Sequence, residues 1–352
     1  MQSVKPIHAE VTVIIPNWNG EAMLRRCLAS LRKTEYPHFQ VLVVDNASTD
    51  SSVQMMRREF PEAHICQSAT NLGYAGGCNL GVLRSSSPFV VFLNNDAEVT
   101  PGWLGPLMEA MKDDTVAAVQ PKVLSIRNRN QFDYCGAAGG EMDLFAYPFA
   151  RGRLFHIMET DEGQYDSAQT IFWATGAACL LRRSALDCTG LLDDTFFAHM
   201  EEIDLCWRFH LAGFSVRAAT DSVVYHQTGG TLDQESLKKM VLNHRNSLIM
   251  MCKNYEWTTL CWALPVRLFL EMITFFGFLL KGQPRRSLAV ILGFRGAMRM
   301  WKSVLSGRAH VRRLRKRTDS VVLARLYHGS VALDFFLFGI RRASQLRLPH
   351  SS

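Results

Sequence analysis

The sequence has 352 residues, of which 48% are hydrophobic, enough for a large buried core in one α/β domain with an appendage or in two domains. Residues 1–10 hold charged side chains and no apolar stretch, so we expect no secretory signal. The nine cysteines are scattered and form no CxxC pair, which argues against a structural zinc site or a redox pair and fits free thiols in a reducing cytoplasm.

The net charge of +7 is unevenly distributed along the chain. Between Glu271 and Asp319 there is no acidic residue but there are twelve lysines and arginines, and subtracting these twelve from +7 leaves −5 for the rest. A mildly acidic body with a strongly basic C-terminal part indicates an anionic surface as a partner.

The first half of the chain alternates between strand and helix patterns. Apolar, β-branched runs predict buried strands at Val11–Ile15, which Pro16 ends, at Val41–Val44 and at Phe89–Leu93. Helical periodicity predicts helices at Glu21–Lys33, Ser51–Glu59 and Pro101–Met111. This alternation is typical of a doubly wound α/β fold with a mostly parallel sheet, in which ligands bind at the carboxyl ends of the strands.

The middle of the chain is less regular. Residues 120–170 are rich in Gly and Asn, and we expect long loops there, which often carry function in enzymes. Regular patterns return in four segments: Ile171–Leu181, a helix at Glu202–Leu211, a strand at Ser215–Ala219, and Val223–His226.

The character of the chain changes beyond Trp257. Trp257–Leu280 is apolar but is interrupted by Pro265, Arg267 and Glu271, so we expect no clean membrane span, which needs about 20 mostly apolar residues. Arg267 and Glu271 lie four residues apart and can pair on one helical face. With Ser287–Trp301, this part predicts basic helices that lie in a membrane interface; the alternative is that it packs on the rest of the chain.

Two acidic positions follow predicted strands. Asn94-Asn95-Asp96 follows Phe89–Leu93, and Asp96 can hold Mg²⁺ or Mn²⁺, hard cations that prefer carboxylate and water oxygens. Asp45 follows Val41–Val44 and can accept hydrogen bonds from a base or ribose. Both segments can equally be ordinary turns, and Asp45 can be a helix cap.

Three further features can carry chemistry. Residues 71–81 hold four glycines before a helical pattern, so the backbone can approach phosphate or sugar closely, although the spacing is not GxGxxG. Glu201, Glu202 and Asp204 open a predicted helix, where acidic residues suit the helix dipole but a carboxylate in a cleft can also be a general base. His226 can be either a structural residue or a ligand-binding residue.

Taken together, these motifs resemble the family 2 glycosyltransferases with the GT-A fold, over roughly residues 10–255. Within that family the chain is similar to the bacterial rhamnosyltransferase-like branch. The segments that carry the resemblance occur in the family's order: Val11–Asn19, Val43–Asp50, Asn71–Gly81, Leu93–Asp96, Phe197–Arg208 and Val224–His226.

The resemblance implies roles for individual residues. Asp96 would be the carboxylate of the metal-binding DXD element and His226 a metal or diphosphate ligand, while Glu202 would be the catalytic base. The implied donor-binding residues are Pro16, Asn17, Asn19, Asp45, Asn71, Gly76 and Asn95. Two positions depart from the family pattern: Asn94 replaces the first DXD carboxylate, and the base position more often holds Asp, so that Glu201 competes with Glu202.

The expected function is an inverting, Mg²⁺- or Mn²⁺-dependent transfer of a sugar from a nucleotide diphosphate donor, with dTDP-rhamnose as the first candidate. The expected acceptor is a hydroxyl of a saccharide or lipid-linked saccharide in bacterial surface polysaccharide synthesis. We expect a GT-A domain at 1–255, with a nucleotide-sugar part at about 10–120 and an acceptor part at about 120–255. A helical, membrane-associating extension at 256–352 would place the enzyme in the cytoplasm, peripherally on the inner face of the membrane, with no nucleic acid partner.

Two rival functions stay open at this point. A sugar nucleotidylyltransferase would show a basic, Gly-rich loop after its first strand, whereas this chain has Pro16-Asn17-Trp18-Asn19-Gly20. A non-catalytic sugar-nucleotide or glycan-binding protein of the same fold is favoured slightly by Asn94 and Asn95 and opposed by Asp96, Glu202 and His226. A processive synthase is disfavoured because a QxxRW motif and multiple clean spans are absent from the sequence.

Overall fold

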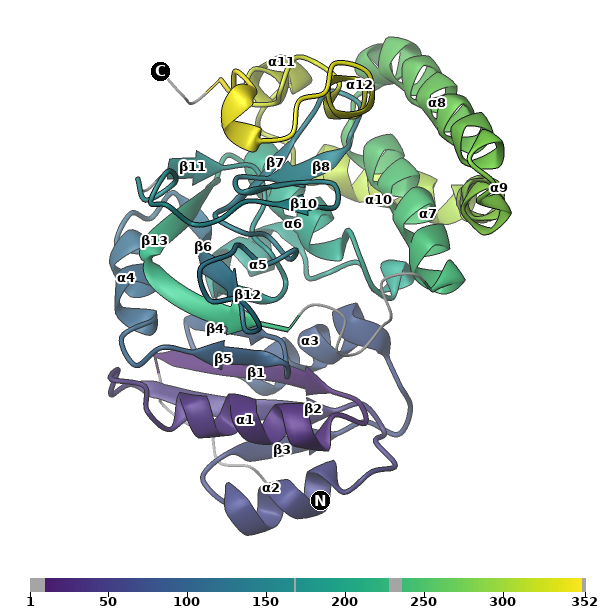
Figure 1. The fold of residues 1–352 in the computed structure, drawn as a ribbon. Coiled ribbons are helices and arrows are strands. Elements are labelled where there is room, and N and C mark those ends of the chain that lie inside the picture. The colour runs from purple at the N-terminus through teal and green to yellow at the C-terminus, as the bar shows by residue number, and fades with distance from the viewer. Residues whose placement is uncertain (1–9, 168, 228–235, 350–352) are drawn as a thin grey trace.

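A computed structural model describes residues 10–167, 169–227 and 236–349. A nine-stranded mixed sheet forms its centre (Figure 1). Its parallel half consists, in spatial order, of β3 (His64–Gln67), β2 (Phe39–Asp45), β1 (Val11–Asn17) and β4 (Phe89–Leu93). The sheet continues from β4 through β12 (Ala178–Arg182), β6 (Val116–Ser125), β13 (Ser215–His226) and β11 (Gln169–Ile171), and β5 (Ala97–Val99) also pairs with β13. The expected doubly wound, mostly parallel α/β architecture is confirmed.

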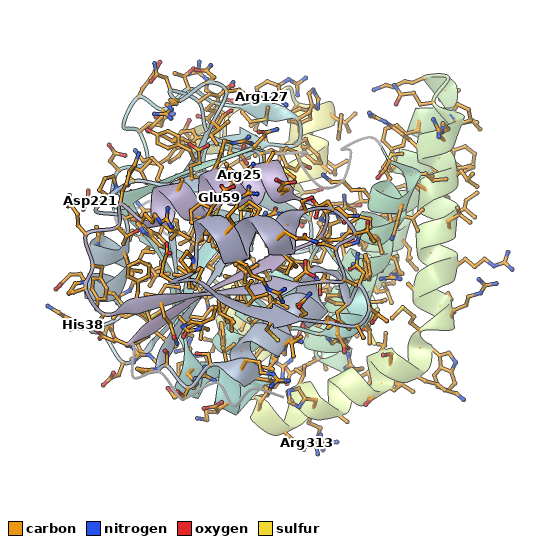
Figure 2. The ribbon with its side chains drawn as sticks, turned by 90° about the horizontal axis from the view of Figure 1, so that it is seen from below. Arg25, His38, Glu59, Arg127, Asp221 and Arg313 are labelled. Carbon is orange, nitrogen blue, oxygen red and sulfur yellow. The ribbon has the colours of Figure 1, made fainter. Side chains whose placement is uncertain are left out.

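Helices cover both faces of the sheet, because β1 points apolar side chains to both faces. Val11, Val13 and Ile15 face one core, and Ile14 faces the other, because successive strand side chains point to opposite faces. The first face is covered by α1 (Glu21–Leu31), α2 (Ser52–Glu59) and α4 (Leu104–Ala110), and the second by α3 (Gly73–Arg84), α5 (Arg183–Thr189) and α6 (Glu201–Leu211). Arg25 of α1 and Glu59 of α2 join across the first layer at 2.8 Å (Figure 2).

The prediction that Pro16 ends the first strand is wrong, because β1 continues through Pro16 to Asn17. The carbonyl of Asn17 accepts from Asn46 N–H on the β2 side, so the alternating backbone turns Pro16 toward β4. Pairing between β1 and β4 ends at Ile14, and the missing N–H of Pro16 therefore costs no ladder bond.

The prediction of long loops at 120–170 is also wrong in large part. Strand β6 reaches Ser125, and four short strands form a second, antiparallel sheet: β7 (Gly140–Met142), β8 (Pro148–Ala150), β9 (Arg153–Leu154) and β10 (Ile157–Met158). Strands of two or three residues are too short to show a period of two, which explains why the sequence pattern missed them. The sheet is anchored by buried aromatic side chains such as Phe132 and Phe149.

The later α/β elements agree with expectation in kind but differ in extent. Helix α6 is confirmed. The segment predicted at 171–181 divides into the end of β11 and the strand β12, separated by residues 172–177. The two strands predicted at 215–219 and 223–226 are one strand, β13, with an irregularity in its pairing to β6 between Ala219 and Val223. A short 3₁₀ turn, Asp194–Phe196, precedes α6.

The C-terminal part is a helical layer that shares its core with the α/β body. It contains α7 (Leu237–Asn254), α8 (Trp257–Leu280), α9 (Pro284–Arg299), α10 (Trp301–Leu314), α11 (Asp319–Leu323), α12 (Val331–Phe336) and a 3₁₀ turn at Ala343–Gln345. Leu314, Leu326 and Phe335 belong to the same apolar cluster as the second face of the sheet. Tyr327 pairs with the β7–β8 sheet through Met142 and Leu144, so this end of the chain packs on the body.

Helix α8 corrects the expectation of an interrupted apolar segment. It is continuous over 24 residues with Pro265 inside it, and by length and composition it is the one helix of the described residues that could cross a membrane. Its two charges face inward: the Arg267 guanidinium donates to Glu271 Oε1 at 2.7 and 3.0 Å, which confirms the expected pair. Because Arg267 is 2% exposed, the charges that interrupt the sequence do not interrupt the outer surface of α8.

Candidate active site

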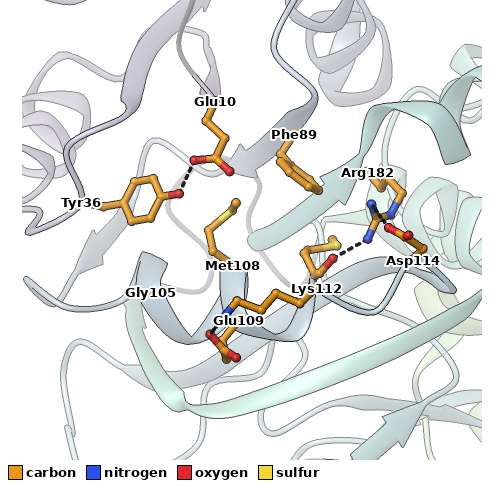
Figure 3. Close-up of a pocket in the computed structure, with 10 residues that line it drawn as sticks. Glu10, Tyr36, Phe89, Gly105, Met108, Glu109, Lys112, Asp114 and Arg182 are labelled. Carbon is orange, nitrogen blue, oxygen red and sulfur yellow. Dashed lines mark hydrogen bonds and ion pairs between the residues drawn. The ribbon is translucent and has the colours of Figure 1, made fainter.

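A cavity opens at the carboxyl ends of β1 and β4, where ligands bind in open α/β sheets. Its walls come from the ends of these strands, from residues 175–177, from the segment 197–202 and from the start of α7. A second cavity lies at the opposite ends of the strands (Figure 3). There Glu10 accepts from Tyr36, Glu109 pairs with Lys112, and Arg182 pairs with Asp114. Its charged groups are paired, whereas the first cavity holds buried polar atoms that form no hydrogen bond with any residue the structure describes, so we assign the site to the first.

The segment Asn94-Asn95-Asp96 forms the floor of this site. Asn94 N–H donates to the carbonyl of Ala177, which ties the segment to the neighbouring loop. The amide of Asn95 donates to Asn17 Oδ1 at 2.7 Å and so joins the ends of β4 and β1. Asp96 is 7% exposed, and no well-directed hydrogen bond reaches its Oδ1 from the described residues.

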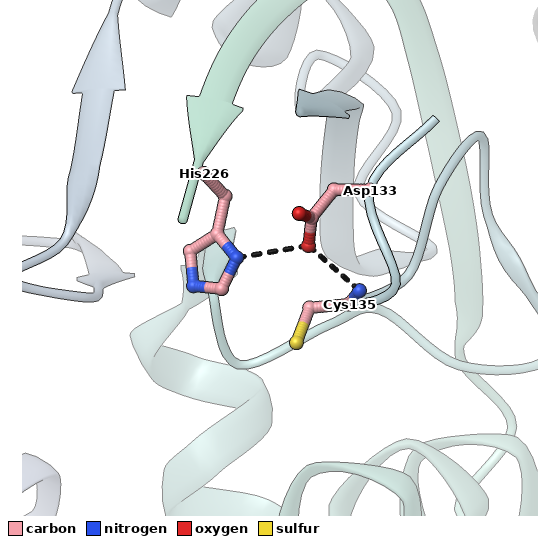
Figure 4. Close-up of side chains that lie close together, drawn as sticks. All are labelled: Asp133, Cys135 and His226. Carbon is pink, nitrogen blue, oxygen red and sulfur yellow. Dashed lines mark hydrogen bonds and ion pairs between the residues drawn. The ribbon is translucent and has the colours of Figure 1, made fainter. Parts of the chain in front are cut away.

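His226, at the end of β13, lies between two carboxylates. Its Nε2 is 3.0 Å from Asp96 Oδ1, and its Nδ1 is 2.9 Å from Asp133 Oδ1 (Figure 4). Asp133 Oδ1 also accepts from the N–H of Cys135 at 2.8 Å, which fixes the carboxylate. Burial lowers the pKa of His226, but Asp96, Cys135 and Asp133 outweigh burial and raise it well above its usual value.

The chemistry of this group fits a divalent cation. Two neighbouring ligands of an octahedral Mg²⁺, each about 2.1 Å from the ion, lie about 3.0 Å apart. The atoms Asp96 Oδ1 and His226 Nε2 have this separation, and no other group of the described residues forms a hydrogen bond with this oxygen. Asp133 holds the other ring nitrogen, an arrangement that orients metal-binding histidines in proteins. Asp133, Cys135 and His226 also lie close enough to share an ion, although a thiolate suits softer metals.

The two glutamates at the start of α6 face the same cavity. Met200, with φ 74°, turns the chain into the helix, so that both carboxyl groups lie near its first turn. Burial raises the pKa of Glu202 to about 7, and burial together with the charge of Glu202 raises the pKa of Glu201 well above its usual value. Glu202 accepts from the backbone N–H of Gly176, whose neighbour Ala177 binds Asn94. Glu202 therefore lies beside the Asp96 segment. The neighbouring Glu201 is almost fully buried, with 3% of its surface exposed.

The structure brings some of the expected donor-binding residues to the cavity and leaves others outside its lining. Pro16, Asn17, Asn71 and Asn95 line it. Asp45 lies behind it at the end of β2, with a buried Oδ1 that has no hydrogen-bond partner in the described chain and so could accept one from a ligand.

Asn19 and Gly76 have structural contacts instead. Asn19 Oδ1 accepts from the backbone of Thr49 and Asp50, which links the loops after β1 and β2. Gly76 lies inside α3, because the Gly-rich segment is itself the first part of that helix rather than a loop before it. A Cβ on Gly73, at φ 72°, would lie 2.6 Å from the carbonyl of Phe197, so this glycine permits the close contact between α3 and the 197–200 segment.

The chain matches the sequence model of the family described as glycosyl transferase family 2 over residues 12–190. The chain belongs to this family. The pre-mycofactocin glycosyltransferase of Mycobacterium tuberculosis is 31% identical over 229 residues, which cover 63% of this chain and 43% of that protein. The N-acetylglucosaminyl-diphospho-decaprenol L-rhamnosyltransferase of the same organism is 26% identical over 275 residues, which cover 72% of this chain and 87% of that one.

Solved structures show that this chain has the GT-A fold. GalNAc-T7, determined with UDP, GalNAc and Mn²⁺, superposes with a TM-score of 0.53 at 16% identity over 69% of this chain and 47% of that one. The mannosyltransferase PcManGT from Pyrobaculum calidifontis, determined with GDP-Man and Mn²⁺, gives 0.51 at 16% identity over 87% and 84%. Membership of the family favours transfer over the nucleotidylyltransferase alternative.

Several residues of the candidate site were not identified from the sequence. Asp133 and Cys135 lie in the stretch interpreted as loops, and their spacing carries no signal of its own. Gly176, His199 and Lys239 also line the cavity. Only the tertiary fold brings these residues to Asp96, which is remote from all of them in sequence.

Proposed function

We propose that this chain is an inverting, divalent-cation-dependent glycosyltransferase that uses a nucleotide diphosphate sugar as donor. The observation that supports this most is the convergence of Asp96, His226 and Glu202 on one cavity at the carboxyl ends of the strands. It joins a candidate cation site with a carboxylate of suitable pKa, two elements that assist a single displacement at an anomeric carbon.

Asp96 and His226 would hold Mg²⁺ or Mn²⁺. When bound there, the cation would neutralise charge that develops on the leaving diphosphate. Asp133 fixes the ring of His226 so that Nε2 faces Asp96, and Asn95 holds the end of β4 against β1. The chain thereby provides a preorganised site for an anionic leaving group, which lowers the cost of reorganisation during reaction.

Glu202 would act as the general base. A carboxyl group with a pKa near 7 is half deprotonated at neutral pH, close to the optimum for a base that takes a proton from a hydroxyl group. The N–H of Gly176 orients its carboxylate next to the Asp96 segment. Glu202 would remove the proton of the acceptor hydroxyl as that oxygen forms the new bond to the anomeric carbon and the bond to the diphosphate breaks.

For the substrates, we propose dTDP-rhamnose or a UDP-sugar as donor and a lipid-linked saccharide of a bacterial surface polysaccharide as acceptor. The name of the mycobacterial rhamnosyltransferase, which acts on a diphospho-decaprenol sugar, supports this proposal. Asp45 would accept a hydrogen bond from the nucleobase or ribose through its buried, unpartnered Oδ1. Pro16, Asn17 and Asn71 would line the donor site.

We further propose that the enzyme binds the inner face of the cell membrane through its C-terminal helices. Figure 2 shows these helices along one side of the molecule, with side chains that point away from the body. Their outer apolar face, defined by the exposed residues Trp262, Phe269, Phe276, Leu280, Ile291, Phe294 and Met298, is extensive. Lys281, Arg285, Arg295 and Arg299 flank it, and anionic lipids attract such side chains by about 1 kcal/mol each. Apolar area plus basic charge is typical of an interfacial helix.

The proposed function is tested by a donor screen. The full chain is incubated with Mn²⁺, a membrane extract and a panel of nucleotide sugars, and new products are detected by mass spectrometry. We expect one donor to add one hexose or deoxyhexose mass to a lipid-linked saccharide, with loss of product in EDTA. A protein that binds a nucleotide sugar but forms no product with any of the donors would instead be the non-catalytic binding protein.

A further inference from the structure

Residues 197–200 form a turn of rare backbone conformation against the cavity. Phe197, His199 and Met200 have φ angles of 64°, 70° and 74°, which residues other than glycine seldom adopt. Asn246 of α7 holds the turn, because its Nδ2 donates to the carbonyls of Phe196, Ala198 and His199 at 3.1, 3.0 and 2.8 Å. Strain of this kind persists where the surrounding structure imposes it, and it is concentrated at ligand sites.

The turn brings His199 close to Lys239, and neither side chain has a polar partner within the described ranges. His199 Nε2 is buried and forms no hydrogen bond. Lys239 is 9% exposed, and its ammonium lies 5.6 Å from the centre of the Tyr134 ring, with no carboxylate at ion-pair distance in the described part of the chain. Burial and the nearby charge of Lys239 lower the pKa of His199 to about 4, so the imidazole is neutral beside a charged lysine.

These unpaired groups match the chemistry of an oxyanion. A buried ammonium without a counter-charge is unfavourable, and a bound anion would remove that cost. A neutral imidazole can add an N–H donor. Lys239 also lies in the first turn of the 18-residue helix α7, where the dipole favours negative charge. His199 and Lys239 both line the cavity, so an anionic ligand group can reach them.

We propose that Lys239 and His199 form a phosphate-binding subsite of this cavity, in addition to the cation site at Asp96 and His226. This inference rests on the proposed function, in which both substrates carry phosphate: the donor as a diphosphate and the lipid-linked acceptor at its lipid junction. The two sources offer the same chemistry to the subsite.

Binding measurements on the full chain separate the two sources. Lys239→Met and His199→Phe are compared with wild type by calorimetry, using UDP and a short-chain prenyl diphosphate as probes, each in Mg²⁺ and in EDTA. We expect Lys239→Met to weaken at least one probe roughly 10- to 100-fold in both buffers, as loss of a charge-assisted hydrogen bond does, and His199→Phe to weaken it roughly 3- to 10-fold. Weaker UDP binding assigns the subsite to the donor, and weaker prenyl diphosphate binding assigns it to the acceptor.

The control is Lys33→Met, which removes an exposed lysine just after α1 that does not line the cavity. It should change the affinities less than threefold, and Lys239→Met should unfold at a temperature no lower than wild type, because it removes an unpaired buried charge. The proposal is overturned if wild type binds neither probe, if Lys239→Met binds both like wild type, or if Lys33→Met weakens them equally. Failure of the proposed function is a separate result, in which wild type binds the probes but transfers no sugar.

Discussion

Replacing Glu202 by Gln tests two things at once. It tests whether Glu202 is the catalytic base, and it tests how much folding stability the protein loses when the buried Glu202 carboxyl group is deprotonated. The substitution preserves size and hydrogen-bonding capacity but removes the ability to take up a proton. We expect turnover to fall by about 10²–10⁴, as for other general bases. Rate per active site of wild type should rise with pH through about 7 as Glu202 loses its proton, and this rise should disappear in the variant.

The magnitude of the stability effect follows from the same pKa. A carboxyl group whose pKa rises from 4.5 to about 7 on folding binds its proton more tightly in the folded state. Its contribution to stability is therefore complete below pH 4.5 and is lost as pH rises through 7. At about 1.4 kcal/mol per pH unit, the upper limit of the loss is about 3.5 kcal/mol, and coupling to Glu201 reduces it.

The assay compares urea unfolding of wild type and Glu202→Gln at pH 5 and pH 8. We expect the variant to be more stable than wild type at pH 8, by on the order of 1–3 kcal/mol, and the two proteins to be nearly equal at pH 5. Glu201→Gln is the matched control, since it changes the neighbouring carboxyl group but should retain transfer. If wild type and Glu202→Gln were equally stable at both pH values and Glu202→Gln kept full turnover, the assignment would be refuted. If Glu201→Gln were inactive and Glu202→Gln active, Glu201 would be the base.

The remaining predictions concern the cation site, the turn and the membrane face. Asp96→Ala should abolish transfer while the far-ultraviolet circular dichroism stays unchanged, and full activity of this variant or of wild type in EDTA would contradict the cation site. Asp133→Asn should weaken Mn²⁺ binding, followed by electron paramagnetic resonance, by roughly 10- to 100-fold, and unchanged affinity would exclude its orienting role. Asn246→Ala should lower the unfolding free energy by about 1–3 kcal/mol, because the carbonyls of Ala198 and His199 lose the Asn246 donor, whereas the Phe196 carbonyl keeps other donors; a stability equal to wild type would show that other contacts hold the turn. Phe269→Ser combined with Phe276→Ser should reduce sedimentation with anionic vesicles at low salt, and unchanged sedimentation would exclude the outer apolar face.

The sequence was most informative where apolar runs are long. Val41–Val44 and Phe89–Leu93 fall within observed strands, and helix 202–211 was predicted to within one residue, because periodicity is clear over such lengths. The short strands β7–β10 gave no such signal. Pro16 was misread because the effect of a missing N–H depends on which side of the strand has a neighbour, and a single sequence does not contain that information.

The candidate site was predictable only in part, for a related reason. Asp96, Glu202 and His226 follow or begin regular elements, so their positions at the strand ends could be inferred. Asp133 comes from an irregular stretch and reaches His226 because its N–H donates to the Val123 carbonyl of β6, the strand that pairs with β13. Arg267 was misread as an interruption because its burial against α7 depends on tertiary contacts, such as its 2.7 Å hydrogen bond to Ser247.

The stereochemistry of transfer tests the central claim most directly. Once a donor is identified, the configuration of the new glycosidic bond is determined by proton nuclear magnetic resonance on the first product and compared with that of the donor. Direct attack by an acceptor hydroxyl, deprotonated by Glu202, predicts inversion at the anomeric carbon. A product that retains the donor configuration would contradict the single displacement and the role of Glu202 as its base.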